Sequence, residues 1–306
     1  MTLRMKHSMI AGIMMMWLLI LAVVISGVHG ALNFKVLSDP KSVKTKKEKS
    51  HPSQPSCTTT AVQCGASVYI DGETLKAQDK EDYCLLKYYF PGVCQGTYLD
   101  IGAGNGMDDS TSWAFYNSDL DWAGVNVELN PDSFEELVRN RRHDIANIQA
   151  AVCSDTDRTV HYAHDVTNLH SSGIWEYTNE QYRETNWPGM TLFNTIEITC
   201  TPIQRILDQT LGKNKNHYFD FATIHIEGAE LNSLLGIDWS RTKFGLIIIE
   251  KNRSEKVNLQ MHSLLRSKGY TLMENDEEVC GRDWYYKNAA FEQIYSRLRV
   301  PQYYSA

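Results

Sequence analysis

The stretch Tyr98–Ser110 reads YLDIGAGNGMDDS. An apolar run typical of a buried strand ends around Asp100, and glycines then occupy every second position, at Gly102, Gly104 and Gly106. Glycine lets the backbone turn tightly and lets a ligand lie directly against it. In an open α/β sheet, ligands bind beyond the carboxyl ends of the strands, so this loop is the expected floor of a binding pocket.

The spacing and charge of this loop argue against a dinucleotide. Dinucleotide-binding loops read GxGxxG, whereas this one reads GxGxG. A pyrophosphate also needs a helix N-terminus without acids, and here Asp108 and Asp109 occupy that position. With Asp100 they suit a cationic cofactor, and S-adenosylmethionine carries a sulfonium and an ammonium but no phosphate. We therefore expect S-adenosylmethionine here, the alternative being a tight turn without a ligand.

Glu128 supports the same cofactor. It lies at the end of the next predicted strand, 122–129. A carboxylate at that place can accept hydrogen bonds from both ribose hydroxyls of an adenosine. The order strand, glycine loop, helix, strand and acid therefore predicts an adenosine site.

Outward from the loop, short apolar runs alternate with segments of helical periodicity. This alternation is typical of a parallel sheet wrapped by helices. Segments 270–275 and 284–291 can pair at one edge. The sequence thus predicts an α/β, Rossmann-like fold, mostly parallel, with helices on both faces and an antiparallel edge hairpin. The predicted strands are 97–102, 122–129, 145–154, 219–228 and 243–252, and the predicted helices are 109–119, 132–142, 201–211, 229–236 and 258–269.

Two helix starts and one insertion are predicted in more detail. Asp132 is expected to cap the helix at 132–142, and Thr201 the helix at 201–211 with Pro202 in its first position. Residues 161–195 interrupt the alternation and are rich in aromatic and polar residues. A long insertion of this kind is most often a loop over the functional site.

Five ordered motifs resemble a known family. They are YLDIGAGNG, WAGVNVELNPDSFEEL, AAVCSD, HIEGAELNSLLGIDW and LIIIEKN, between Tyr98 and Phe291. The series resembles the FkbM-type methyltransferases, a branch of the class I S-adenosylmethionine-dependent fold. The resemblance implies O-methylation of hydroxyl groups, often on sugars or secondary metabolites. It also implies cofactor contacts at Asp100, Gly102, Gly104 and Glu128, with Ala151 and Val152 near the adenine.

The chain departs from the family pattern at two places. Where the family usually has EPNP, this chain has Glu128-Leu129-Asn130-Pro131. Where the family commonly has DVEGAE, this chain has His225-Ile226-Glu227-Gly228-Ala229-Glu230. The second change puts in doubt any mechanism that needs an aspartate there, including one with a divalent metal. The cysteines form no zinc-like CxxC pair, so we expect no metal.

Methyl transfer to an alcohol is helped by a general base, because the hydroxyl proton must leave. His225 is one candidate, since histidine titrates near neutral pH; a structural histidine in the core is the alternative. Glu227 could orient it or hold the substrate, or with Glu230 simply stabilise a helix N-terminus. His170 is a third candidate because it lies in the insertion. Aromatic residues there could stack on a sugar ring or pack internally: Trp175, Tyr177, Tyr182 and Trp187.

The N-terminal part reads as a membrane segment followed by a stalk. Residues 1–34 contain the apolar run 9–28, about the length that a helix needs to cross a bilayer. We expect an uncleaved signal-anchor, the alternative being a signal peptide cut near Ala31 with secretion of the chain. Residues 35–56 are rich in lysine, serine and proline and are expected to be disordered.

Residues 57–95 form a cysteine-containing extension before the methyltransferase domain, 96–306. The chain has seven cysteines, four of them in the extension. Buried free thiols are one interpretation, and disulfides in an oxidising lumen are the favoured one. We therefore expect a single-pass membrane protein of the secretory pathway, facing the Golgi or ER lumen.

The net charge of the folded part limits the binding partners that we expect. Residues 57–306 hold 22 basic and 35 acidic residues, a formal charge of −13. Such a body repels a phosphate backbone, so nucleic acid is not an expected partner. The expected partner is a hydroxyl-bearing acceptor, a sugar, glycan or small molecule. Two rival functions remain: a catalytically inactive binding or scaffold protein of the same fold, and a nicotinamide-dependent reductase.

Overall fold

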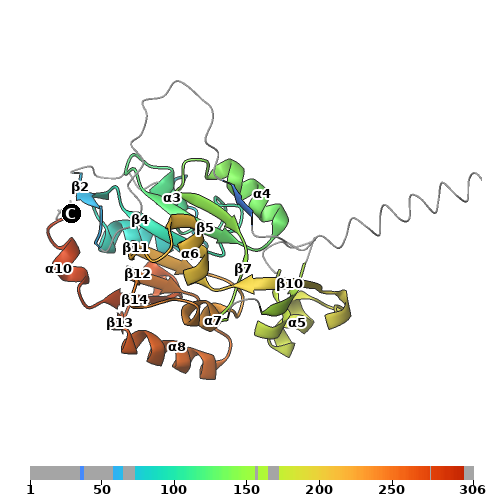
Figure 1. Cartoon of the computed structure of the whole chain (residues 1–306). Helices are drawn as coiled ribbons and strands as arrows, with labels where there is room; N and C mark the ends of the chain where they lie inside the picture. The colour runs from blue at the N-terminus through green and yellow to red at the C-terminus, as the bar shows by residue number, and fades with distance from the viewer. Residues whose placement is uncertain are drawn as a thin grey trace, which may run out of the picture. The chain divides into compact units, whose positions relative to one another are not determined.

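The computed structural model describes the backbone of residues 35–37 and all of residues 58–64, 73–155, 158–164, 172–275 and 277–299. Its centre is a sheet of eight strands in the order β1-β6-β5-β4-β11-β12-β14-β13 (Figure 1). The strands are β1 (Lys35–Leu37), β4 (Thr97–Ile101), β5 (Ala123–Glu128), β6 (Ala146–Gln149), β11 (His217–Ile224), β12 (Thr242–Ile249), β13 (Tyr270–Leu272) and β14 (Trp284–Asn288).

The five central strands are parallel. β6, β5, β4, β11 and β12 pair in parallel register, whereas β14 runs antiparallel to β12 and β13 antiparallel to β14. A short helix, α9 (Glu277–Cys280), lies between β13 and β14, so their connection is longer than a hairpin turn. The strand order reverses between β4 and β11. This switch point is where open α/β sheets bind ligands.

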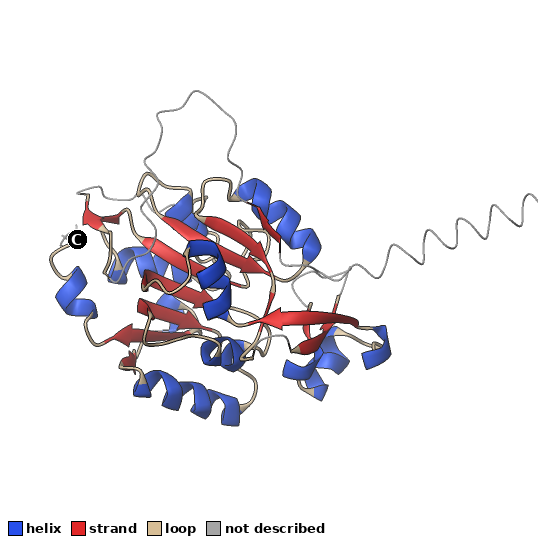
Figure 2. Ribbon diagram, in the orientation of Figure 1, coloured by secondary structure: helices blue, strands red, loops and turns tan. Residues whose placement is uncertain are grey.

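Helices cover both faces of the sheet (Figure 2). Tyr98 and Leu99 are neighbours on β4 and point to opposite faces, and each belongs to a different buried cluster. The Leu99 cluster includes residues of α6 (Ile203–Leu211), α7 (Glu230–Leu235) and α8 (Glu255–Ser267). The Tyr98 cluster includes residues of α2 (Glu81–Cys84), the π-helical turn η1 (Leu85–Tyr89), α3 (Trp113–Tyr116) and α10 (Phe291–Tyr295). A further helix, α4 (Pro131–Asn140), packs on β5 and β6.

The predicted third strand is divided between two sheets. Its first part is β6, and its second part, β7 (Ala151–Val152), joins a four-stranded sheet ordered β7-β10-β8-β9. The insertion expected as a loop therefore has regular structure and a core of its own. Its elements are β8 (Thr159–Ala163), β9 (Gly173–Ile174), the 3₁₀ turn η3 (Trp175–Tyr177), α5 (Glu180–Asn186), the 3₁₀ turn η4 (Leu192–Asn194) and β10 (Ile196–Thr201).

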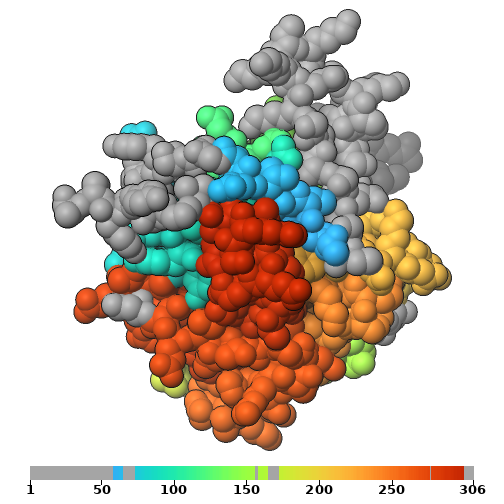
Figure 3. All heavy atoms as spheres, turned by 90° about the vertical axis from the view of Figure 1, so that its left-hand side faces the viewer, coloured from blue at the N-terminus to red at the C-terminus, as the bar shows by residue number. Residues whose placement is uncertain are grey.

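The N-terminal extension packs onto the body of the domain. Strand β2 (Val62–Gln63) pairs with β3 (Val93–Cys94), and residues 58–64 lie against the C-terminal segment (Figure 3). The fully buried Asp220 on β11 links them, because it accepts hydrogen bonds from Thr59, from the Thr97 amide at 2.6 Å and from Tyr295 at 2.5 Å. The extension, the central strand and the C-terminus are thus joined through one carboxylate.

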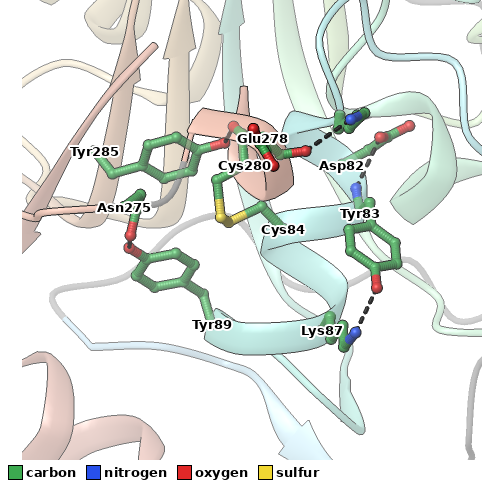
Figure 4. Close-up of a disulfide and its surroundings, with 10 residues drawn as sticks. Asp82, Tyr83, Cys84, Lys87, Tyr89, Asn275, Glu278, Cys280 and Tyr285 are labelled. Atoms are coloured by element: carbon green, nitrogen blue, oxygen red, sulfur yellow. Dashed lines mark hydrogen bonds between the residues drawn. A yellow bond between two sulfur atoms is a disulfide. The ribbon is translucent and has the colours of Figure 1, made fainter. Parts of the chain in front are cut away.

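Six of the seven cysteines form disulfides, which confirms the interpretation of disulfides over free thiols for these six. The pairs are Cys64–Cys94, Cys84–Cys280 and Cys153–Cys200. Only the first lies within the extension. Cys84–Cys280 joins α2 to α9 across 196 residues (Figure 4).

Three sequence predictions are wrong in detail. The cap of α4 is Asn130, whose side chain accepts from the amides of Asp132 and Ser133. α6 begins at Ile203 with Pro202 as its cap, one residue later than expected, because Thr201 ends strand β10. Residues 35–37 of the predicted disordered stalk form β1, which pairs antiparallel with β6, and the rest of the stalk, 38–56, lies outside the described residues.

The predicted membrane segment, residues 1–34, lies outside the described residues. Among those that the structure describes, helices are too short or too polar to cross a membrane.

Candidate functional site

A pocket of about 560 Å³ lies at the carboxyl ends of the parallel strands. Its lining includes residues just beyond β4, β5, β11 and β12, so it sits at the switch point of the sheet. Pockets that hold drug-sized ligands measure about 300–1,000 Å³. The expected location of the site is therefore occupied by a cavity of suitable size.

The glycine loop forms one wall of this pocket. Gly102 has φ +86°, and a Cβ built there would lie 1.8 Å from the carbonyl oxygen of His225, so only glycine lets the ends of β4 and β11 approach this closely. Gly104 has φ +56°, and a Cβ there would meet no atom within 4 Å. The Gly104 position therefore faces open space, where a ligand can lie against the backbone.

Glu128 holds the loop and lines the pocket. Its Oε2 accepts from the Gly104 amide at 2.8 Å, and its Oε1 accepts from the Asn130 amide at 2.6 Å. Burial raises the pKa of Glu128, while these backbone hydrogen bonds oppose the rise. Each carboxylate oxygen has a further lone pair, so the side chain can still accept hydrogen bonds from a ribose.

Arg141 supports the loop from below, a role that the sequence did not reveal. Its side chain is fully buried. The guanidinium donates to the Gly106 carbonyl, to the Tyr98 hydroxyl at 2.8 Å and to the Ser110 hydroxyl at 2.7 Å. Asp144 lies 3.5 Å away and balances its charge. An arginine that follows the last turn of a helix is usually a surface residue, so no local pattern distinguishes this one.

Three predicted cofactor residues lie outside the wall of the pocket. Among its described lining residues, Asp100, Gly106 and Ala151 do not occur. The Asp100 carboxylate is buried and accepts from Ser112 at 2.5 Å, so its hydrogen bond belongs to the protein interior. Ala151 is absent from the lining, whereas both of its neighbours along the chain belong to it. Leu129, Ala150 and Val152 give that end of the pocket an apolar surface suited to an adenine.

His225 lines the pocket, but its environment argues against a role as general base. Its Nε2 lies 2.5 Å from Oδ2 of Asp283. Burial alone would lower the pKa of His225, but the charge of Asp283, with those of Glu250 and Glu81, raises it to about 10. At neutral pH the imidazole is therefore protonated and has no free lone pair to accept a proton.

Glu227 lies in the pocket wall and is already paired. Its backbone is left-handed, with φ +50°, and its carboxylate lies 3.2 Å from Nη1 of Arg253. Neither observation connects it to His225 as an orienting group. The third candidate, His170, lies outside the described residues.

The aromatic residues of the insertion pack on one another. Trp175 and Trp187 stack with their ring centroids 6.0 Å apart, and Tyr182 meets Trp187 edge-on. Within the described lining of the 560 Å³ pocket, these three and Tyr177 do not occur. Trp175, Tyr182 and Trp187 form a small internal cluster, and this packing does not support their stacking on a sugar ring in this pocket.

Comparison with known families agrees with this arrangement. A model of the methyltransferase FkbM domain matches residues 100–272, more than half of the 306 residues. The chain belongs to the FkbM methyltransferase family. A search of the curated proteins finds no match to it.

Two segments outside the matched FkbM domain complete the pocket. Gln78, Asp79 and Glu81 come from before it, and Glu277, Arg282 and Asp283 from after it. The Cys84–Cys280 disulfide joins these segments (Figure 4). Lys80 also donates a hydrogen bond to the Glu278 carbonyl at 2.7 Å. We call these six lining residues the outer wall. None of the five motifs that carry the family resemblance contains any of these six residues, so the resemblance did not point to the outer wall.

Most charged groups near the outer wall are paired. Arg282 lies 2.9 Å from Asp79, and Lys251 lies 2.6 Å from Glu277. Glu81 is 1% exposed, and its carboxylate accepts from the Asp79 amide at 3.0 Å. Burial, followed by the charge of Asp283, raises the pKa of Glu81 to about 7.

Within the described residues, no three His, Cys, Asp or Glu side chains are grouped so as to hold a metal ion.

Proposed function

We propose that this FkbM methyltransferase transfers a methyl group from S-adenosylmethionine to a hydroxyl group of a sugar, glycan or small metabolite. The observation that carries the proposal is the Gly104–Glu128 contact at the switch point, beside the open pocket. When bound, S-adenosylmethionine supplies an electrophilic methyl group on a sulfonium.

The described residues fit this cofactor in shape and charge. Gly104 offers open backbone, Glu128 offers acceptors for ribose hydroxyls, and the apolar end suits the adenine. The pocket is also lined by more carboxylates than cationic groups, which favours a cationic ligand over a phosphate. The chain's task is then to hold the acceptor oxygen in line with the methyl group, since alignment supplies much of the acceleration in such displacements.

Calorimetry on the full-length protein in detergent tests the cofactor. We expect S-adenosylmethionine to bind and NADH not to bind. The Glu128→Ala variant should lose at least about tenfold in affinity, because the ribose hydrogen bonds and the support of the loop are both lost. Glu135→Ala on the exposed face of α4 is the matched control and should bind as the wild type does. Tight binding of NADH, or unchanged affinity in Glu128→Ala, would contradict the assignment.

We also propose that the body faces the lumen of the secretory pathway and is held by its N-terminal segment. Three disulfides support an oxidising compartment. In intact microsomes, residues 57–306 should resist added protease, and the chain should keep its full-length mass. Digestion without detergent would overturn the orientation. Secretion of a chain starting near Ala31 would overturn the anchor.

A further inference from the structure

Glu250 is a carboxylate of the pocket wall whose side chain has no hydrogen-bonding or ionic partner among the described residues. It follows directly after β12, next to the end of β11 that carries His225. Its amide donates to the Ile224 carbonyl at 3.2 Å, which fixes the backbone at the pocket edge. Its carboxylate makes no hydrogen bond or ion pair with any residue that the structure describes, although it lines the pocket.

The surroundings of Glu250 allow its carboxylate to accept a proton near neutral pH. Burial, followed by the negative charges of Glu227 and Glu230, raises the pKa of Glu250 to about 7, although His225 opposes the rise. A base works best when its pKa lies near the working pH. The charged and titratable groups around it, taken from every element packed on this part of the pocket, are Glu81, Tyr182, His225, Glu227, Glu230, Lys251, Arg253 and Asp283.

The pairing of these neighbours singles out one carboxylate. Asp283 is matched by His225, and Glu227 by Arg253. Glu230 accepts from Asn252 at 2.8 Å and from the Gly228 amide at 2.8 Å. Glu81 accepts from a backbone amide and belongs to the outer wall. Among these carboxylates, Glu250 is the one whose side chain makes no hydrogen bond or ion pair with a described residue.

We propose that Glu250, rather than His225, lies beside the reacting methyl group and takes the proton of the acceptor hydroxyl. In this step the acceptor oxygen forms a bond to the methyl carbon while the bond between that carbon and sulfur breaks. The electron pair of the broken bond stays on sulfur, which becomes a neutral thioether. The hydroxyl proton passes to the Glu250 carboxylate, which becomes a neutral carboxyl group.

This inference rests on the proposed function, and its first test needs no acceptor. S-adenosylmethionine and S-adenosylhomocysteine differ in the methyl group and in the charge on sulfur. A carboxylate close to the sulfur therefore favours the former only when it is ionised. In the full-length protein, calorimetry should show that the preference for S-adenosylmethionine grows about tenfold between pH 5.5 and 7.5.

Matched variants assign that change to one residue. In Glu250→Gln the preference should stay flat with pH. Glu81→Gln removes the other carboxylate of the pocket that titrates near pH 7, and the pH dependence should persist in it. Glu135→Gln, on the exposed face of α4 and outside the pocket lining, is the matched control and should follow the wild type. A pH dependence that survives in Glu250→Gln, or that disappears in Glu81→Gln instead, overturns the proposal. Failure of the wild type to bind S-adenosylmethionine would defeat the proposed function itself.

A second test addresses the proton. With labelled S-adenosylmethionine and the methyl glycosides of glucose, galactose and mannose as probes, turnover of the wild type should rise with pH through about 7. Glu250→Gln should lose 10²–10⁴-fold in turnover with little loss of cofactor affinity, the share typical of a positioned base. Retention of most of the turnover in Glu250→Gln would exclude the base role. Absence of transfer to the glycosides by the wild type would count against the sugar acceptor, and the binding test would still decide the place of Glu250.

Discussion

The two ends of the pocket are built in different ways. The end that we assign to the cofactor, called the cofactor end, consists of one continuous stretch, β4, the glycine loop and β5, with Glu128 and Arg141 holding it. The end that we assign to the acceptor, called the acceptor end, gathers the outer wall, His225 and Glu250 from parts of the chain up to about 200 residues apart, and the Cys84–Cys280 disulfide joins the two segments of the outer wall. The first end is therefore fixed by local sequence, and the second exists only when distant segments have come together.

The largest loss of stability is expected from a substitution that disturbs the cofactor end alone. Arg141→Met removes a buried charge and leaves the buried Asp144 carboxylate without its ion-pair partner, so it should lower the free energy of unfolding by about 3–5 kcal/mol. The loop that Arg141 supports should also lose affinity for S-adenosylmethionine. Urea denaturation and calorimetry measure the two effects.

The control is Arg139→Met, an exposed residue on the same helix, which should change stability by less than about 0.5 kcal/mol. Equal effects of the two variants would show that Arg141 has no special role beneath the glycine loop.

The next effect concerns the acceptor end. Removing the Cys84–Cys280 disulfide with Cys84→Ser and Cys280→Ser should cost about 2–4 kcal/mol of stability. Because Asp283 lies three residues after Cys280, its contact with His225 should weaken, and the pKa of His225 should fall toward its ordinary value. NMR titration of the histidines measures this shift.

Cys153→Ser with Cys200→Ser provides the matched control, since that disulfide lies in the smaller sheet. It should lower stability by a similar amount and leave the titration of His225 near pH 10. If His225 titrated near pH 10 in both double variants, as in the wild type, the outer wall would be held without the disulfide.

The smallest expected effect is the contribution of the His225–Asp283 ion pair to the melting temperature. The folded pKa of His225 lies above its unfolded value of about 6.5, so the pair stabilises the fold fully below that pH. This stabilisation is lost as the pH rises through about 10. The melting temperature of the wild type should therefore exceed that of Asp283→Asn by a few degrees at pH 6 and by less at pH 10.5.

Asp79→Asn is the control for this pH effect, because it removes an aspartate of the same wall whose partner, Arg282, is exposed. Surface pairs contribute little, so its melting temperature should stay within about a degree of the wild type at both pH values. A difference in Asp283→Asn that does not change with pH would mean that the pair is not ionic.

The contrast between the two ends also explains what could be predicted from sequence. The presence of Gly102, Gly104 and Glu128 in the pocket wall could be predicted, because their spacing along the chain reflects how one loop meets one strand. Asp100 and Ala151 have the expected neighbours, but the direction of their side chains depends on packing with Ser112 and with the smaller sheet. Sequence gives the register of a strand more readily than the contacts of each side chain.

Chemistry at the acceptor end could not be predicted in the same way. The protonation of His225 depends on Asp283, which is 58 residues away in the chain and has no motif around it. Glu250 belongs to the motif LIIIEKN, yet the role proposed for it follows from the pairing of its neighbours, which only the folded arrangement reveals. Burial and charge pairing are collective properties, and no single stretch of sequence carries them.

The long span between Cys84 and Cys280 has a consequence for synthesis. A chain made from its N-terminus reaches α2 early, but the partner cysteine emerges only after the whole parallel sheet has been made. Asp283 follows still later, so His225 spends that interval without its counter-charge. The glycine loop and Glu128 can meet long before then. The binding end of the pocket can therefore form during translation, whereas the end assigned to the acceptor must wait until the chain is almost complete.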